Sequence, residues 1–478
     1  MTAPARWRAL AAAVLLAGCA PAAAHADPAQ PIAGAAALQP FFVALDDLSA
    51  GRRKAPVRIL QIGDSHTAGD VISGGLRARF QARYGAAGRG VLPAGKPYAG
   101  YAPHQVDVQT SGDWRIEASF APSNARPNPE GFPTHASGGA FGLSGWRLTS
   151  EGEGASMTVA ADPEAVFDHA TVCGLDRPGA GSALVEAGGV STRIDLAAGA
   201  PGPACRTIDL PAPAASLKIT TAGGPVTLYS VATARERPGV ILSNLGVGGS
   251  QLGDFAARDD GVLKAELAAY APDLIILAFG DNEGFGASLD PTGYQALVGA
   301  QIARLKRLAP GAAILVVGPP DGETIRPDIP EDGIRNKGFA CAALSDAERG
   351  DYAARVARRD PALARWYAPP NLAVVRGAER GAAAASGAAF WDWGGRMGGD
   401  CSAHAWRQLD PPAMRGDHVH FTSEGGDAVA ALLYADLMAA AARPAATVPP
   451  AAASPTVAAA PIAAPAVAAP PADPKGEH

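Results

Sequence analysis

The chain has 478 residues, enough for two or three domains, and its 46 acidic and 40 basic residues give a net charge of −6. This balance argues against a protein that neutralises nucleic-acid phosphates, because counterion release requires a basic excess. Hydrophobic residues make up 48% of the chain, which excludes wholesale disorder. No apolar run reaches the ~18–20 residues of a membrane-spanning helix. We therefore expect a soluble, globular protein.

The first residues have the pattern of a secretory signal over residues 1–26. Two arginines precede a short apolar run at 9–17, and the run ends in Leu-Ala-Gly-Cys19. This ending resembles the lipobox of bacterial lipoproteins, in which the cysteine is acylated and becomes the mature N-terminus. Ala24–Ala26 offers an ordinary cleavage site as the alternative. The pattern predicts an exported, periplasmic protein, which a lipidated Cys19 would anchor to a membrane without spanning it.

Four cysteines remain when Cys19 is set aside: Cys173, Cys205, Cys341 and Cys401. An even number in an oxidising compartment predicts disulfides, and four cysteines allow three pairings. Neighbourhood in the sequence favours Cys173–Cys205 and Cys341–Cys401. A zinc site is the rival interpretation, which the absence of any C-x-x-C spacing disfavours.

Buried strands and helices alternate along most of the chain. In chain order, the patterns predict a strand at 57–62, a helix at 71–84, strands at 240–245 and 274–279, a helix at 294–308, a strand at 313–317 and a helix at 423–441. This order predicts an α/β fold with a mostly parallel sheet and helices on both of its faces.

Residues 103–236 interrupt that alternation with short, alternating apolar segments separated by Gly, Pro and Asp. This pattern predicts an antiparallel β-sandwich inserted into the α/β domain, whose two parts are then 27–102 and 237–442. The last segment, 443–478, is rich in Ala and Pro and has no aromatic residue, so we expect a disordered spacer there.

Four short polar motifs follow predicted strands or precede a predicted helix. They are Gly63–His66 (GDSH), Asn244–Ser250 (NLGVGGS), Gly280–Glu283 (GDNE) and Asp417–His420 (DHVH). A serine at the carboxyl end of a parallel strand places its hydroxyl in the crevice where α/β proteins bind ligands. The helix that follows offers backbone N–H groups to a developing negative charge.

This ordered set resembles the motifs of the SGNH (GDSL-type) hydrolase superfamily, over about 55–100 and 237–441. The resemblance implies a three-layer α/β/α fold and a role for each matching position. Those roles are Ser65 as the nucleophile, Asp417 and His420 as the acid and base, and Ser65, Gly249 and Asn282 as the oxyanion hole. It implies no metal and no organic cofactor.

Two departures from the common motifs, His66 and Glu283, look like a subgroup, the peptidoglycan O-acetylesterases with an inserted β-sandwich. Phe390–Trp393 (FWDW) and Asp417–Thr422 (DHVHFT) are also similar to that subgroup. The resemblance implies an exported esterase that removes acetyl groups from the C6 hydroxyl of N-acetylmuramic acid, with an O-acetylated glycan as its partner. An O-acetyltransferase with the same triad and a non-catalytic glycan-binding scaffold are the alternatives.

Other motifs are weaker evidence of function. Gly90–Lys96 nearly matches a phosphate-binding loop but has Pro97 in place of the Ser or Thr. His418 and His420 are spaced as a pair of metal ligands could be, but the sequence shows no evident third ligand. We expect His66 and His418 to pack rather than to act chemically. Trp114 and Trp146 either stack on sugar rings or fill core space.

Overall fold

The computed structural model describes residues 31–120, 139–326, 329 and 338–443. The predicted signal segment with Cys19 lies outside these residues, as does the Ala/Pro-rich segment after Arg443. Among the described residues, no helix combines the length and the apolar character needed to cross a membrane.

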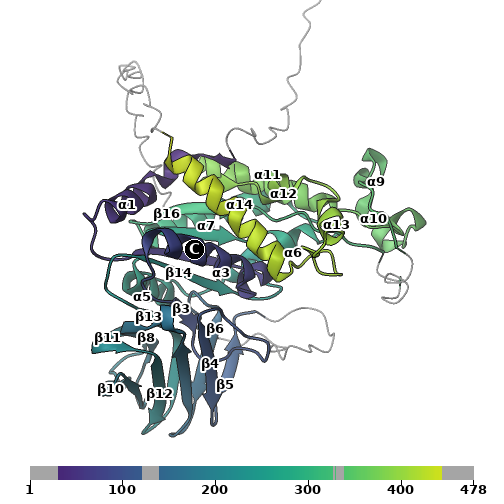
Figure 1. Cartoon of the computed structure of the whole chain (residues 1–478). Coiled ribbons are helices and arrows are strands. Elements are labelled where there is room, and N and C mark those ends of the chain that lie inside the picture. Colours follow the sequence, from purple (N-terminus) through teal and green to yellow (C-terminus); the bar gives the residue numbers. More distant parts are fainter. Residues whose placement is uncertain (1–30, 121–138, 327–328, 330–337, 444–478) are drawn as a thin grey trace, which may run out of the picture. The chain divides into compact units, whose positions relative to one another are not determined.

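The central sheet has six strands in the order β1-β17-β16-β15-β2-β14 (Figure 1). Their bounds are β1 (Ile32–Ala33), β17 (Ala389–Trp391), β16 (Ala313–Val317), β15 (Leu274–Ala278), β2 (Val57–Gly63) and β14 (Val240–Gly246). All neighbouring strands are parallel except β1, which pairs antiparallel with β17. The largely parallel sheet predicted from the sequence is therefore confirmed.

Helices cover both faces of this sheet. Side chains alternate along each strand, so each strand contributes apolar residues to both faces. Ile59 and Ile276 belong to the core under one layer of helices, and Leu60 and Ile275 belong to the core under the other. The first layer contains α1 (Gln39–Ser49), α3 (Val71–Tyr84) and α14 (Ser423–Ala441); the second contains α5 (Asp260–Tyr270), α7 (Pro291–Leu308) and α11 (Pro370–Ala385).

Short helices occupy the connections. They are η1 (Ala35–Leu38), α2 (Ser65–Ala68), η2 (Pro163–Ala165), α4 (Leu252–Ala256), α6 (Asp281–Gly284), α9 (Asp346–Gly350), α10 (Tyr352–Ala357), η3 (Pro361–Leu363), α12 (Trp393–Met397) and α13 (Ser402–Arg407). Three of them, α2, α4 and α6, carry or adjoin the polar motifs.

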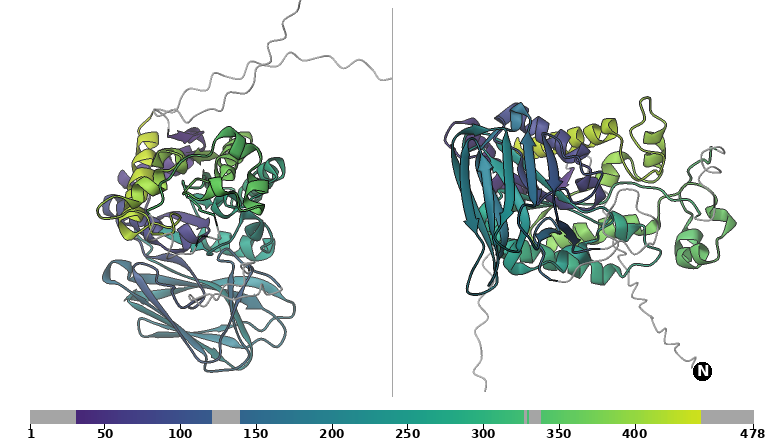
Figure 2. Two further views of the ribbon diagram at one scale, coloured as in Figure 1. Left: turned by 90° about the vertical axis from the view of Figure 1, so that its right-hand side faces the viewer. Right: turned by 90° about the horizontal axis from the view of Figure 1, so that it is seen from below.

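Between β2 and β14 the chain forms two antiparallel sheets that share one core (Figure 2). One sheet contains β10 (Val190–Asp195), β9 (Ser182–Ala187), β12 (Ser216–Ala222), β7 (Ser156–Ala161) and β4 (Val106–Ser111), in that order. The other contains β11 (Gly202–Ala214), β8 (Phe167–Asp176), β13 (Val226–Ala234), β6 (Trp146–Ser150) and β5 (Arg115–Ala118). We refer to these two sheets as the β module.

One strand of the β module lies outside the predicted insertion. β3 (Gly90–Pro93) pairs antiparallel with β13, although its residues precede the predicted boundary at 103. The run is only four residues long, too short for its periodicity to be recognised. The division of the chain at 102 and 236 therefore remains a prediction.

Buried polar contacts join the β module to α5. Glu266 of α5 accepts a hydrogen bond from the backbone N–H of Leu143 at 2.6 Å and another from the Ser230 hydroxyl of β13. Tyr270 of the same helix contacts Ser230 at 2.8 Å. Because all of these groups are buried and paired, they fix the module against the α/β part.

Both disulfides favoured by the sequence are present. Cys173 and Cys205 face each other on β8 and β11, and Cys341 is bonded to Cys401 across 60 residues of sequence. Disulfides are typical of proteins that fold in oxidising compartments.

Candidate active site

Ser65 is the first residue of α2, directly after the end of β2. β2 lies between β15 and β14, and Gly63 is level with Ala278 on one side and Gly246 on the other. A Cβ atom at Gly63 would collide with the Ala278 carbonyl and the Thr67 hydroxyl, so the turn into α2 requires glycine. The Asp64 carboxylate caps α2 by accepting the His66 N–H at 3.0 Å.

The structure brings Ser65, His420 and Asp417 into one chain of hydrogen bonds. His420 Nε2 lies 3.0 Å from Ser65 Oγ, and His420 Nδ1 lies 2.9 Å from Asp417 Oδ2. An ionised carboxylate only accepts, so Nδ1 donates to Asp417 and Nε2 is left to accept the serine proton. Serine and histidine are 355 residues apart in the sequence.

The Asp417 side chain holds the Asp417–His420 turn together. Asp417 Oδ1 accepts the N–H groups of Val419 at 3.0 Å and His420 at 2.9 Å. Burial opposes ionisation of this carboxylate, but the hydrogen bonds from His420 hold the pKa of Asp417 well below its usual range. Asp417 therefore stays negative across neutral pH.

Ser65, Asp417 and His420 open onto a groove of about 450 Å³. Tyr98 and Arg415 also line it. Arg415 donates from its backbone to the His420 carbonyl at 2.7 Å and from Nε to the Phe421 carbonyl at 3.1 Å. The volume is within the range of pockets that hold small molecules or part of a polymer.

The residues expected to form an oxyanion hole come from the neighbouring strand ends. Gly249 follows β14 with a φ of +78°, a conformation that favours glycine. Asn282 is in α6, after β15, and its amide donates to the Ser250 carbonyl at 3.0 Å. An amide has two N–H bonds, so one remains for a ligand. Because β14 and β15 flank β2, both residues emerge at the same sheet edge as Ser65.

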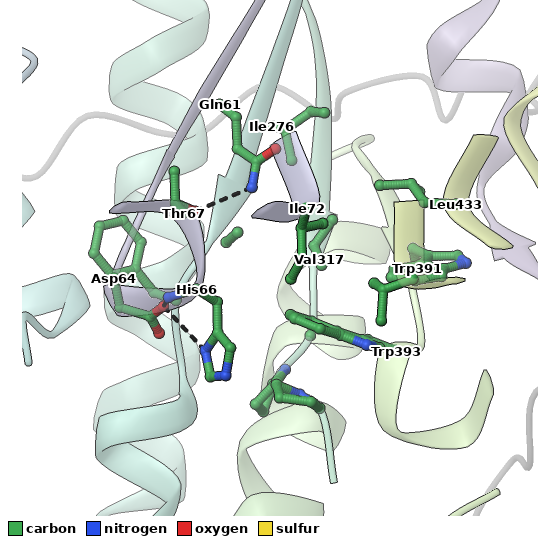
Figure 3. A pocket seen from close by; sticks show the side chains of 16 residues that line it. Gln61, Asp64, His66, Thr67, Ile72, Ile276, Val317, Trp391, Trp393 and Leu433 are labelled. Carbon is green, nitrogen blue, oxygen red and sulfur yellow. Dashed lines mark hydrogen bonds and ion pairs between the residues drawn. The ribbon is translucent and has the colours of Figure 1, made fainter. Parts of the chain in front are cut away.

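Two buried charges beneath the serine were not expected from the sequence. His66 is 6% exposed, and its Nε2 lies 3.0 Å from the Val419 carbonyl and its Nδ1 3.4 Å from Asp64 (Figure 3). Burial lowers the pKa of His66, but the carboxylates of Asp64 and Asp281 outweigh it and raise the pKa to about 9. Burial in turn raises the pKa of Asp281, which His66 partly offsets. His66 is therefore a buried cation. It also packs against Trp393 and Phe421, as the sequence predicted.

Other residues singled out in the sequence have structural roles. Glu283 accepts the N–H of Leu252 at 2.7 Å, at the start of α4. Trp146 is 2% exposed, and Trp114 packs against the module core and donates to the Ser156 carbonyl. These two tryptophans fill core space in this structure.

Comparisons with known proteins find a similar fold but no matching sequence family. No family profile matches the chain, and no curated protein matches it. Among solved structures, the chain is similar to one titled "Peptidoglycan O-acetylesterase in action", with a TM-score of 0.64 and 24% identity. The match covers 86% of this chain and 99% of the other. At this identity the likeness establishes the fold alone, and it agrees with the α/β architecture expected from the sequence.

Two further matches are weaker. A family two carbohydrate esterase from Clostridium thermocellum gives a TM-score of 0.16 at 10% identity, over 36% of this chain and 74% of that one. A family 2 enzyme with a carbohydrate-binding domain from Corynascus thermopiles (Myceliophthora fergusii) gives 0.25 at 12% identity, over 69% and 99%. Scores this low carry no argument about function.

Proposed function

We propose that this protein is an exported serine esterase that hydrolyses O-acetyl esters on a glycan, and that its substrate is peptidoglycan acetylated at C6 of N-acetylmuramic acid. The observation that carries the proposal is the hydrogen-bonded chain from Ser65 through His420 to Asp417. A serine hydroxyl becomes an effective nucleophile when an adjacent, oriented base takes its proton.

The proposed reaction has two half-reactions. His420 removes the proton of Ser65 as Oγ attacks the acetyl carbonyl, and the resulting oxyanion is stabilised by N–H groups of Ser65, Gly249 and Asn282. His420 then protonates the sugar oxygen as it leaves, which gives an acetyl-serine. Water, activated by the same histidine, attacks this ester and releases acetate and the free serine.

The choice of an acetylated glycan rests on the fold likeness and on the groove. The similar solved structure is described as a peptidoglycan O-acetylesterase, and the match covers nearly all of that chain. The groove beside Ser65 offers an aromatic ring, Tyr98, and a cation, Arg415. An aromatic face and a guanidinium suit a sugar polymer that also carries carboxylates.

Export is proposed on independent grounds. The two disulfides favour an oxidising compartment, and the lipobox-like sequence at Cys19 favours a membrane-anchored lipoprotein in the periplasm.

The test is acetate release from O-acetylated peptidoglycan by the purified protein, beside acetylated xylan and p-nitrophenyl acetate. We expect release from peptidoglycan and p-nitrophenyl acetate, and loss of both activities in Ser65→Ala and His420→Ala. Ser243→Ala is the matched control, because this buried serine of β14 does not line the groove. Undiminished turnover by the Ser65 variant would refute the mechanism.

The same assay separates hydrolysis from acetyl transfer. A hydrolase releases acetate at a rate that an added glycan acceptor leaves unchanged. A transferase instead gives an acetylated acceptor at the expense of free acetate. Faster release from xylan than from peptidoglycan would contradict the proposed substrate while leaving the serine mechanism intact.

A further inference from the structure

A second group of chemically capable side chains lies next to the Asp417–His420 turn. Glu323 follows β16, His404 lies in α13 and His418 lies within the turn. One ligand atom from each side chain can be chosen so that all three lie within 4.8 Å of one another. Glu323 and His418 are 1% and 5% exposed, so two of the three donors are withdrawn from water.

Contacts among these residues hold the donors together. Glu323 Oε2 lies 2.6 Å from His418 Nδ1, and Glu323 Oε1 accepts the backbone N–H of His404 at 2.8 Å. The backbone N–H of Glu323 also donates to the His418 carbonyl at 3.0 Å. These bonds preorganise the carboxylate and the His418 ring, as the outer contacts of metal ligands commonly do.

One nitrogen in the group lacks a partner. Within the described part of the chain, His404 Nδ1 is buried and makes no hydrogen bond. A buried nitrogen without a partner carries a desolvation cost that a bound cation would remove.

Charge and packing around the group favour a cation. Among the described residues, neither Glu323 nor the nearby buried Asp321 forms a salt bridge with lysine or arginine. Trp366 stacks on the His418 ring with 3.9 Å between centroids and covers one side of the group. Negative charge in an apolar surrounding is compensated by a metal ion or by protons.

We propose that Glu323, His404 and His418 form a Zn²⁺-binding site beside the turn that carries Asp417 and His420. Two imidazoles and one carboxylate are a ligand set that Zn²⁺ accepts, with water in the fourth position. The sequence spacing does not reveal this set, because Glu323 and His404 are 81 residues apart. His420 is not one of the ligands, so the site is independent of the proposed esterase chemistry.

A metal at this site would also connect separate segments of the chain. His418 has a φ of +59°, and Asp417 and Val419 flank it directly. A metal held by His418 therefore links the turn to α13 and to the segment after β16.

The test is metal binding by the whole exported protein, purified without a histidine tag and stripped with a chelator. We expect elemental analysis and calorimetry to show one Zn²⁺ per chain, and Co²⁺ in its place to give visible d–d absorption. His404→Gln and His418→Gln should each lower Zn²⁺ affinity by at least about 10-fold. Circular dichroism verifies that both variants are folded.

His169→Gln is the matched control. His169 also contacts carboxylates, with Nδ1 at 2.6 Å from Asp168 and Nε2 at 3.2 Å from Asp209, but it lies in the β module. We expect this variant to bind Zn²⁺ as the parent does. The proposal is overturned if the parent protein binds no Zn²⁺, or if His404→Gln binds as tightly as the parent. Zinc binding is measured without an ester, so a negative result here leaves the proposed function standing.

Discussion

His66 is hydrogen-bonded to the Val419 carbonyl at 3.0 Å, which joins the residue after Ser65 to the residue before His420. The two imidazole rings of His66 and His420 are stacked, with 5.5 Å between centroids. Trp393 packs edge-on against His66 (Figure 3). His66 therefore connects the two segments whose separation sets the distance between Ser65 and His420.

We predict that His66→Leu lowers kcat for p-nitrophenyl acetate by up to about 100-fold, because displacing a reacting group by 1 Å costs that much. KM should change little, since the bonds lost do not contact the substrate. The measurement is steady-state hydrolysis together with the melting temperature. An unchanged kcat in a folded variant would show that the His66–Val419 bond does not position the serine and histidine.

A buried network of charged side chains is connected to α2. Asp70 accepts hydrogen bonds from Arg77 at 2.9 Å and Arg89 at 3.1 Å, and both arginines also donate to Asn244. Asn244 then donates to the Thr67 carbonyl at 2.9 Å. The two arginines hold the pKa of Asp70 well below its usual range despite burial. The network thus links the helix of Ser65 to β14.

Asp70→Asn should destabilise the fold by about 3–5 kcal/mol, because it leaves two buried guanidinium groups without their carboxylate. Asparagine tolerates the left-handed backbone of position 70, where φ is +52°, so backbone strain is not added. Urea unfolding measures the loss. Asp427→Asn is the control: Asp427 is 60% exposed, and its pair with Arg79 is worth about 0–1 kcal/mol. Equal effects would contradict the buried-network account.

Much of the α/β fold follows from sequence periodicity. The strands at 57–62 and 313–317 and the helices at 71–84 and 423–441 coincide with β2, β16, α3 and α14 to within a residue. These segments are long or uniformly apolar, so local pattern and burial agree. The β module is predicted only as a sandwich, without individual strands. In β8 and β11, for example, polar residues interrupt the alternation expected for one buried face.

The candidate site was predictable only in part. Ser65, His420 and Asp417 could be named because they fall in short motifs. The buried charges of His66 and Asp281 and the grouping of Glu323 with His404 could not be predicted. They depend on which side chains the fold brings together from distant segments, and sequence spacing carries no record of that.

Stability should depend on pH through Glu266. Burial raises the pKa of Glu266 to about 7, above the ordinary value of 4.5 that it regains on unfolding. The folded state therefore binds this proton more tightly, and the resulting stability is fully present below about pH 4.5. It declines as pH rises toward 7, by roughly 3 kcal/mol at 1.36 kcal/mol for each unit of pKa.

Glu266→Gln should flatten the dependence of the unfolding free energy on pH between about 4.5 and 7. Urea unfolding at several pH values measures this. Glu186→Gln, at an exposed position of β9, should leave the profile unchanged. A parent protein whose stability rises across this window, with no change in Glu266→Gln, would rule out Glu266 as the group responsible.

Asn282 provides the sharpest test of the proposed oxyanion hole. Asn282→Ala should lower kcat for p-nitrophenyl acetate by about 10²–10³-fold, equivalent to about 2.7–4 kcal/mol, with little change in KM, because the amide acts on charge that develops in the transition state. Asn371→Ala is the matched control, since Asn371 also donates to a backbone carbonyl, that of Gly286 at 2.7 Å. A lower melting temperature in both variants, with a lower kcat only in Asn282→Ala, would show that the amide takes part in the reaction. If KM and kcat fell by the same factor in Asn282→Ala, or if kcat fell equally in both variants, the role of Asn282 would be limited to holding the Ser250 segment in place.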